Sequence, residues 1–168
     1  VLLFLGAAIV ALFFQPQIIV DWIREFIEEL IGITEGLNVW QMILYILQNN
    51  LKASFLGMIF GLILGVFPVF LALANGYVLG FVSEKVVQVE GFTSLWRLLP
   101  HGIFELPALF ISLALGTKLG FFIFAKYGQV KQEFLRRLEN SLRVFLFVVI
   151  PLLVIAAVIE GILIFLVS

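Results

Sequence analysis

The chain has 168 residues, of which 63% are hydrophobic and 12% charged, and its mean hydropathy is +1.21. Soluble domains are about 45–50% apolar and about 25% charged. This composition therefore excludes a soluble enzyme domain and, because disordered chains are poor in apolar residues, a disordered chain. The net charge of −1 implies no nucleic-acid partner, and the absence of cysteine excludes disulfides, thiol nucleophiles and cysteine metal sites. A multi-pass membrane protein remains, and its spans are helices because the apolar runs are continuous.

The first apolar run covers residues 1–14. It is shorter than the roughly 20 residues that a spanning helix needs, so we expect a truncated first span. Apolar residues then recur at helical spacing from Ile19 to Leu30, opposite four acidic residues and Arg24, and Pro16 suits the first turn of such a helix. We expect this amphipathic helix to lie on the outer membrane surface or to cap the bundle, the simpler alternative being a connector.

Residues 53–82 carry no charge. As one helix they would reach about 45 Å, which is too long for one passage through a hydrocarbon core of about 30 Å. Gly65 and Pro68 lie near the middle, and glycine with proline interrupts helices. The run therefore predicts two short helices, at about 51–66 and 69–83, joined by a tight turn.

Two further apolar runs, at 102–125 and 144–167, complete the predicted fold. It is an all-α bundle of about five membrane helices in a single integral membrane domain, 1–168. Residues 126–143 hold five basic and two acidic residues, and we expect the amphipathic part, 130–143, to be either an interfacial helix or an extension of the last span. Because Lys and Arg favour cytoplasmic loops, the N-terminus is predicted inside and the C-terminus outside.

Small residues recur every four positions in three of the predicted helices. Such stripes let helix backbones approach closely in lipid. They predict either packing within the chain or a homodimer interface, and the spacing alone does not distinguish the two. The stripes are Ala53, Gly57, Gly61 and Gly65; Gly76 and Gly80; and Gly116 and Gly120.

Four polar residues lie in the outer half of the membrane on this topology, and we expect an intramembrane polar cluster of Asn75, His101, Glu105 and Glu160. His101 and Glu105 are four apart and share a helix face. Ionisable residues inside a membrane are rare and face the protein interior. Asn75 precedes Gly76, which predicts either a local helix break or a hydrogen bond from Asn75 to a neighbouring helix.

Three interpretations of this cluster stay open. It could be a structural network, a proton- or ion-handling site, or a metal site with His101, Glu105 and Glu160 as candidate ligands. A catalytic zinc needs three protein ligands and the chain has one His, which makes a metal-dependent membrane enzyme the weakest of the three. The sequence contains no glycine-rich phosphate loop and no serine with a convincing base partner, so we expect neither an enzyme nor a cofactor.

The run from His101 to Ala108, HGIFELPA, is the most specific motif in the chain. Together with Asn49-Asn50-Leu51-Lys52-Ala53, the glycine stripe and Asn75-Gly76, it resembles the stage II sporulation protein M family of integral membrane proteins, also called DUF95, over roughly residues 45–165. The resemblance implies a role in assembly, since the namesake in spore-forming bacteria is a membrane partner of two other engulfment proteins, one of them a peptidoglycan hydrolase. Many relatives occur in archaea and in bacteria that do not sporulate.

The sequence thus predicts a non-catalytic, homodimeric protein of the plasma membrane of a bacterium or archaeon, which organises other membrane or envelope proteins within the lipid bilayer. The alternative is a small transporter or channel that uses the intramembrane His, Glu and Asn site. A water-accessible cavity that reaches Glu105 would favour transport, and a dry network in which all polar atoms are paired would favour the organiser.

Overall fold

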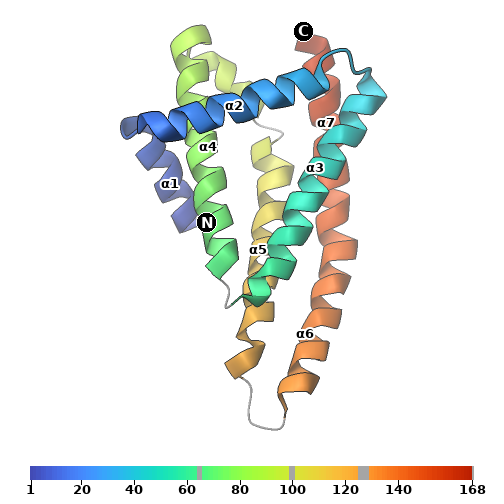
Figure 1. Ribbon diagram of the computed structural model, residues 1–168. Coiled ribbons are helices and arrows are strands. Elements are labelled where there is room, and N and C mark those ends of the chain that lie inside the picture. Colours follow the sequence, from blue (N-terminus) through green and yellow to red (C-terminus); the bar gives the residue numbers. More distant parts are fainter. Residues whose placement is uncertain (64–65, 99–100, 125–128, 168) are drawn as a thin grey trace.

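The computed structural model is a bundle of helices (Figure 1), and it describes residues 1–63, 66–98, 101–124 and 129–167. Side chains are described for these residues except 97, 98, 101 and 167. The α-helices are α1 (Leu2–Phe13), α2 (Gln17–Thr34), α3 (Val39–Ile59), α4 (Val66–Glu90), α5 (Leu106–Gly120), α6 (Val130–Val144) and α7 (Ile150–Val167). Shorter turns of 3-10 or π-helix are η1 (Phe60–Leu62), η2 (Phe92–Leu98), η3 (His101–Glu105), η4 (Phe121–Phe124) and η5 (Phe145–Val149).

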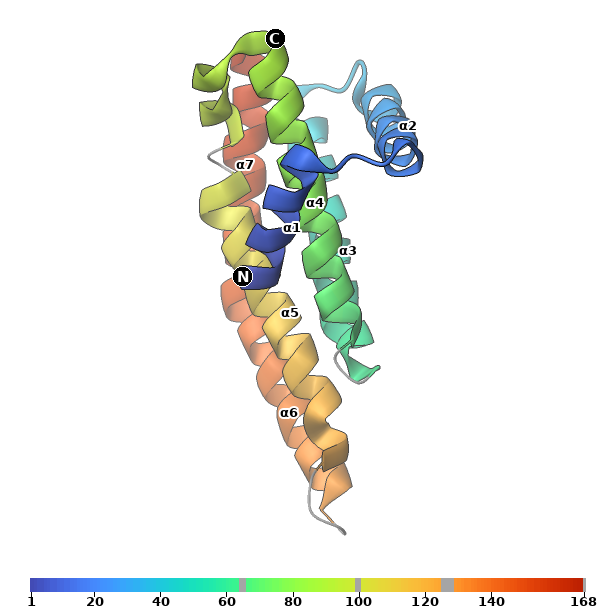
Figure 2. The same ribbon diagram turned by 90° about the vertical axis from the view of Figure 1, so that its left-hand side faces the viewer.

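The long helices run side by side and alternate in direction along the chain (Figures 1 and 2). α3 and α5 run away from α2, whereas α4 and the rod formed by α6 and α7 run towards it. The main core lies where α3, α5 and α7 meet, around Met58, Leu119, Val149 and Leu153, whose side chains are fully buried. α1 packs beside α4, and α2 crosses the end of the bundle.

Within the described residues, three helices are long and apolar enough to cross a membrane, namely Val66–Glu90, Gly102–Phe124 and Val130–Leu166. The bent pair α1 and α2 would make a fourth if it is counted as one span. The sequence predicted about five membrane helices, which is more than these three or four. The numbers differ because α1 has only 12 residues and because α3 carries Gln48, Asn49, Asn50 and Lys52 near its middle. These polar side chains lower the hydropathy of a helix that is otherwise long enough to span.

The predicted break in the uncharged run is observed. α3 and η1 end at Leu62, and α4 begins at Val66 with Pro68 in its first turn, where the missing backbone N–H of proline is tolerated. The predicted bounds of the two helices are too narrow, since α3 begins at Val39 and α4 continues to Glu90. α3 starts early because Asn38 and Gln41 form a reciprocal capping box, in which each side chain bonds the backbone N–H of the other.

α6, η5 and α7 form one continuous helix of 37 residues, Val130–Leu166. At 1.5 Å per residue it is about 55 Å long, well beyond a hydrocarbon core of about 30 Å. The amphipathic segment 130–143 is therefore an extension of the last span and not a separate interfacial helix.

Four glycines of the stripes, namely Gly61, Gly76, Gly80 and Gly116, lie where helix backbones within the chain approach closely. A Cβ added to Gly61 of η1, the turn that follows α3, would come within 2.4 Å of the backbone of Gly116 in α5. A Cβ on Gly76 or Gly80 of α4 would lie 2.2 Å from the carbonyl oxygens of Phe4 and Ala8 in α1. Real Cβ contacts are never so short, so these crossings require glycine. Gly65 lies outside the described residues.

Candidate functional site

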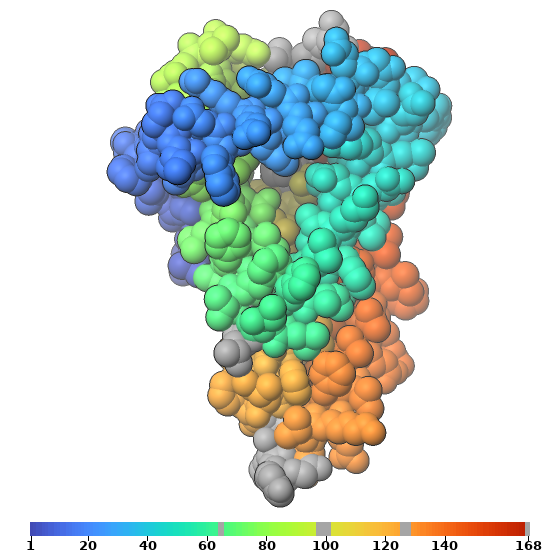
Figure 3. All heavy atoms as spheres, viewed as in Figure 1, coloured from blue at the N-terminus to red at the C-terminus, as the bar shows by residue number. Residues whose placement is uncertain are grey.

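A cavity of about 650 Å³ lies beneath α2 and between α3, α4, α5 and α7. Figure 3 shows the molecular surface hollowed below α2, between α4 and α3. We call it the acidic cavity, because two glutamates line it and no Lys, Arg or His is among its described lining residues. The lining is Phe26, Ile27, Leu30, Thr34, Met42, Tyr45, Ile46, Asn49, Asn50, Ala53, Ser54, Asn75, Val78, Leu79, Val82, Glu105, Leu109, Glu160 and Ile164.

Three of the four residues predicted to form a polar cluster line the acidic cavity. Asn75 comes from α4, Glu105 from the junction of η3 and α5, and Glu160 from α7. Both glutamates are partly buried and both have interaction partners. The side chain of His101 lies outside the described ones, so the predicted pair of His101 and Glu105 stays a prediction.

Neither predicted role of Asn75 is observed. α4 continues through Asn75 and Gly76 without a break. The side-chain Nδ2 of Asn75 donates a 2.9 Å hydrogen bond to the carbonyl oxygen of Leu71, one turn earlier in the same helix. This bond uses an amide N–H and leaves the side-chain oxygen of Asn75 as an acceptor at the cavity wall.

α3 supplies polar lining residues that the sequence analysis missed. Tyr45, Asn49, Asn50 and Ser54 all face the acidic cavity, and Thr34 of α2 joins them. The predicted helix covered about residues 51–66, although Tyr45 and Asn49 continue the four-residue spacing of Ala53 and Gly57. That spacing, together with the capping signal at Asn38, was the available evidence for a helix with one polar face.

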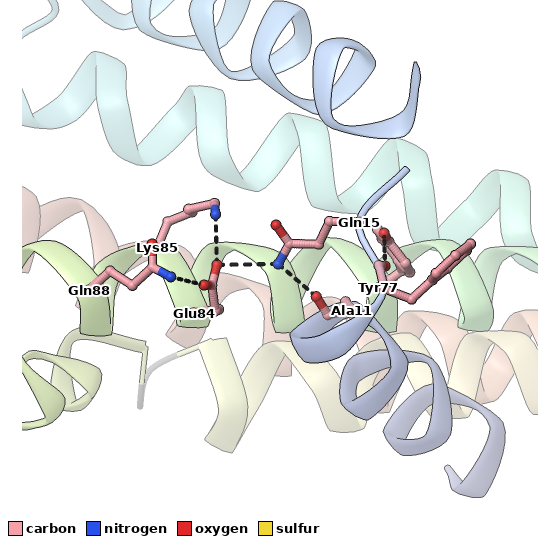
Figure 4. Close-up of polar contacts among 7 residues, drawn as sticks. Ala11, Gln15, Tyr77, Glu84, Lys85 and Gln88 are labelled. Carbon is pink, nitrogen blue, oxygen red and sulfur yellow. Dashed lines mark hydrogen bonds and ion pairs between the residues drawn. The ribbon is translucent and has the colours of Figure 1, made fainter. Parts of the chain in front are cut away.

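A polar contact fixes the turn between α1 and α2, which bends the chain by 106° (Figure 4). The hydroxyl of Tyr77 in α4 donates to the carbonyl oxygen of Phe14 at 2.6 Å. Next to it, the Nε2 of Gln15 donates to the carbonyl of Ala11 at 2.8 Å and to Oε2 of Glu84 at 3.2 Å. Glu84 also pairs with Lys85 and Gln88. These bonds tie the bend to α4 and so hold α2 across the mouth of the acidic cavity.

Apolar packing supports the same arrangement. Val20 and Ile23 of α2 are buried against Ala11 and Phe81. The acidic residues and Arg24 lie on the exposed face of α2. Trp22 is also exposed and lies at the edge of the apolar face. This distribution is typical of a helix that lies in a membrane surface with its charges in water.

The opposite end of the bundle is basic. The Nη1 of Arg137 in α6 donates a 2.9 Å hydrogen bond to the carbonyl oxygen of Lys118, in the last turn of α5. Arg137 also pairs with Glu133 at 3.3 Å. A cation is favourable at a helix C-terminus, so this contact ties α5 to α6 where both helices extend beyond η1.

No group of three His, Cys, Asp or Glu side chains among the described residues could hold a metal ion. Because the side chain of His101 is not one of these, the candidate set of His101, Glu105 and Glu160 stays untested. Glu105 and Glu160 offer oxygen ligands only. The chemistry that the described lining supports is recognition of a cation or a hydrogen-bonding solute.

Long apolar helices around a partly polar interior define the chain as a multi-pass membrane protein with an all-α fold. It belongs to the stage II sporulation protein M family, whose model matches residues 1–163. An uncharacterised protein of Methanocaldococcus jannaschii is 35% identical over 125 residues, which are 71% of this chain and 54% of the relative. The chain thus spans about half the length of the curated relative that it matches. No solved structure matches it.

Proposed function

We propose that the protein handles a small, positively charged polar solute and acts as a small transporter or channel with the acidic cavity as its site. The observation that carries this proposal is the cavity itself, because it reaches Glu105 and Glu160 from the surface beneath α2. A closed network of paired polar atoms would have favoured a purely structural role. A transporter or channel, the alternative function predicted from the sequence, is therefore better supported than a membrane organiser.

The lining suits a cation in three ways. The two glutamates give the lining a negative character, and a cation is the ligand charge that complements it. The amides of Asn49, Asn50 and Asn75 and the hydroxyl of Tyr45 offer neutral oxygen acceptors around it. The volume of about 650 Å³ lies within the roughly 300–1,000 Å³ of small-molecule sites.

A membrane organiser is the second candidate, and two observations favour it. The chain belongs to the stage II sporulation protein M family, and the resemblance to its namesake implies a role in the assembly of partner proteins. The exposed face of α2 carries Asp21, Glu25, Glu28 and Glu29, an acidic surface that a basic partner protein would complement. Neither candidate requires catalysis.

Flux through proteoliposomes tests the first candidate. Purified protein is reconstituted, and the uptake of radiolabelled tetramethylammonium is measured under an inside-negative potassium diffusion potential. We expect uptake above that of empty liposomes, with a large loss in Glu105→Gln and Glu160→Gln, which keep the side-chain shape and remove the charge. Glu25→Gln, on the exposed face of α2, is the matched control and should leave uptake unchanged.

Uptake equal to that of empty liposomes would reject the transport proposal, provided that the reconstituted protein elutes as one species in mild detergent. Pull-down from native membranes then tests the organiser. A protein that co-purifies with the wild type and is lost when Glu25, Glu28 and Glu29 are changed to Gln would support it. If no such partner is found, the organiser proposal is rejected as well.

A further inference from the structure

We propose that the acidic cavity and an adjoining apolar groove together bind a membrane lipid with an amine headgroup, such as phosphatidylethanolamine. The ammonium group would lie in the cavity beside Glu105 and Glu160, and an acyl chain would lie in the groove. This inference rests on the cavity of the proposed function and names the chemical class of its ligand.

The groove has a volume of about 820 Å³ and is formed by α1, α2 and α4. Its lining is apolar apart from the polar tips of Trp22 and Tyr77, and the hydroxyl of Tyr77 is already bonded to Phe14. A polar solute therefore finds no hydrogen-bond partner there, whereas a hydrocarbon chain needs none and packs by van der Waals contact. The lining residues are Leu2, Leu3, Gly6, Ala7, Val10, Ile19, Trp22, Ile23, Phe26, Phe70, Leu73, Ala74, Tyr77 and Val78.

The groove and the acidic cavity are neighbours, because Phe26 of α2 and Val78 of α4 line both. α2 therefore covers a polar, acidic compartment and an apolar compartment that meet at these two side chains. A small soluble cation would fill only the first compartment, and a hydrocarbon only the second. One amphiphile with a cationic head fills both.

The depth of the two compartments agrees with this ligand. α2 has its apolar face towards the bundle and its charges exposed, which places it at the boundary between headgroups and hydrocarbon. The acidic cavity lies directly beneath α2, where a headgroup can enter, and the groove continues along α1 and α4 among lipid tails. The amides of Asn49 and Asn50 and the hydroxyl of Tyr45 supply donors for the phosphate that accompanies the amine.

Native mass spectrometry tests the inference. The full chain is reconstituted into nanodiscs with equal amounts of phosphatidylethanolamine and phosphatidylglycerol and transferred to mild detergent, and the retained lipids are identified by mass. We expect a several-fold excess of phosphatidylethanolamine over phosphatidylglycerol on the wild type. The double variant Glu105→Gln, Glu160→Gln should lose this excess, because the charge that distinguishes the two headgroups is gone.

Gly6→Phe tests the groove separately. A Cβ at Gly6 meets no atom within 4 Å, so the new ring can enter the groove without a backbone clash. This variant should retain fewer lipids of both kinds. Gly32→Phe is the matched control, since Gly32 is equally open, lies on α2 and lines neither compartment. It should behave as the wild type.

Equal retention of the two lipids by the wild type, or full retention by Gly6→Phe, would overturn the inference. A dimer mass in place of lipid adducts would also overturn the inference, because a second copy of the chain would then occupy the groove. Tetramethylammonium uptake that depends on Glu105 without a phosphatidylethanolamine excess would reject the lipid and keep the transport function. A glutamate-dependent excess without uptake would keep the lipid site and reject transport.

Discussion

The hydroxyl of Tyr77 donates a hydrogen bond of 2.6 Å to the carbonyl oxygen of Phe14, which is 63 residues away in the sequence. Phe14 follows the last turn of α1, and Pro16 prevents the chain from continuing as a regular helix. The bond therefore satisfies an acceptor that the bend leaves without a helical donor. It links the position of α2, and so the cover of the acidic cavity, to one side chain of α4.

Removal of this hydroxyl should loosen the bend. Tyr77→Phe keeps the ring in the groove and deletes the bond, and we expect a loss of about 0.5–1.5 kcal/mol in unfolding free energy. Denaturant titration of the purified protein in mixed micelles measures it. Ser83→Ala is the control, because its hydroxyl bonds only Leu79 of its own helix and not the bend. Equal effects of the two variants would contradict the assigned role of Tyr77.

The crossing of η1 with α5 should not tolerate a methyl group. A Cβ at Gly61 would overlap the backbone of Gly116, so Gly61→Ala must push the helices apart. We expect a destabilisation of about 1–3 kcal/mol, as for other overpacked sites. Gly32→Ala meets open space and should be neutral or stabilising by up to about 1 kcal/mol, because alanine favours helix. A neutral Gly61→Ala would show that the helices do not cross here.

The acidic cavity should select reagents by charge. The chain has no cysteine, so Asn75→Cys introduces a single thiol at the cavity wall. We expect a cationic methanethiosulfonate to modify it faster than an anionic one, and the difference should shrink in Glu105→Gln. Mass spectrometry of the modified protein gives both rates.

Phe147→Cys provides the control for this experiment. Phe147 lies on η5 with 73% of its surface exposed and is remote from the cavity lining. In a bilayer it should react slowly with both charged reagents. If the thiol at position 75 reacts no faster than the thiol at position 147, the cavity is closed to water and the transport proposal fails.

The two ends of the bundle should label from opposite sides of the membrane. Glu28→Cys lies on the exposed face of α2, and Arg136→Cys lies on α6 at the basic end. Because basic segments stay in the cytoplasm, a membrane-impermeant maleimide added to intact cells should modify position 28 and not position 136. Modification of both positions without lysis would overturn the proposed orientation.

The sequence predicted the helices better than their ends. Continuous apolar runs indicated α4, α5 and α7, and Gly65 with Pro68 indicated the break before α4. The start of α3 was missed because hydropathy falls across Gln48 to Lys52, although the capping box at Asn38 marks it. Hydropathy responds to average polarity, whereas a helix start depends on a few specific hydrogen bonds.

The cavity could be predicted only in part. Asn75, Glu105 and Glu160 were found because polar groups in apolar runs are conspicuous. The polar face of α3 was missed, and the apolar groove has no sequence signal at all, since Gly6 and Ala74 resemble any other small residues in a span. The helix that each glycine stripe contacts could not be predicted either. The spacing of small residues indicates a close helix contact but does not identify the partner helix.

The continuous helix of α6 and α7 carries Glu160 into the acidic cavity and Glu139 to the basic end, about 31 Å apart along one axis. Arg137, on the basic half, holds the end of α5, whose first residues follow Glu105. The two cavity carboxyl groups thus lie on two helices whose other ends are joined by the Arg137 contact. We expect a ligand that changes the angle between α5 and α6 at this contact to change the separation of Glu105 and Glu160 as well.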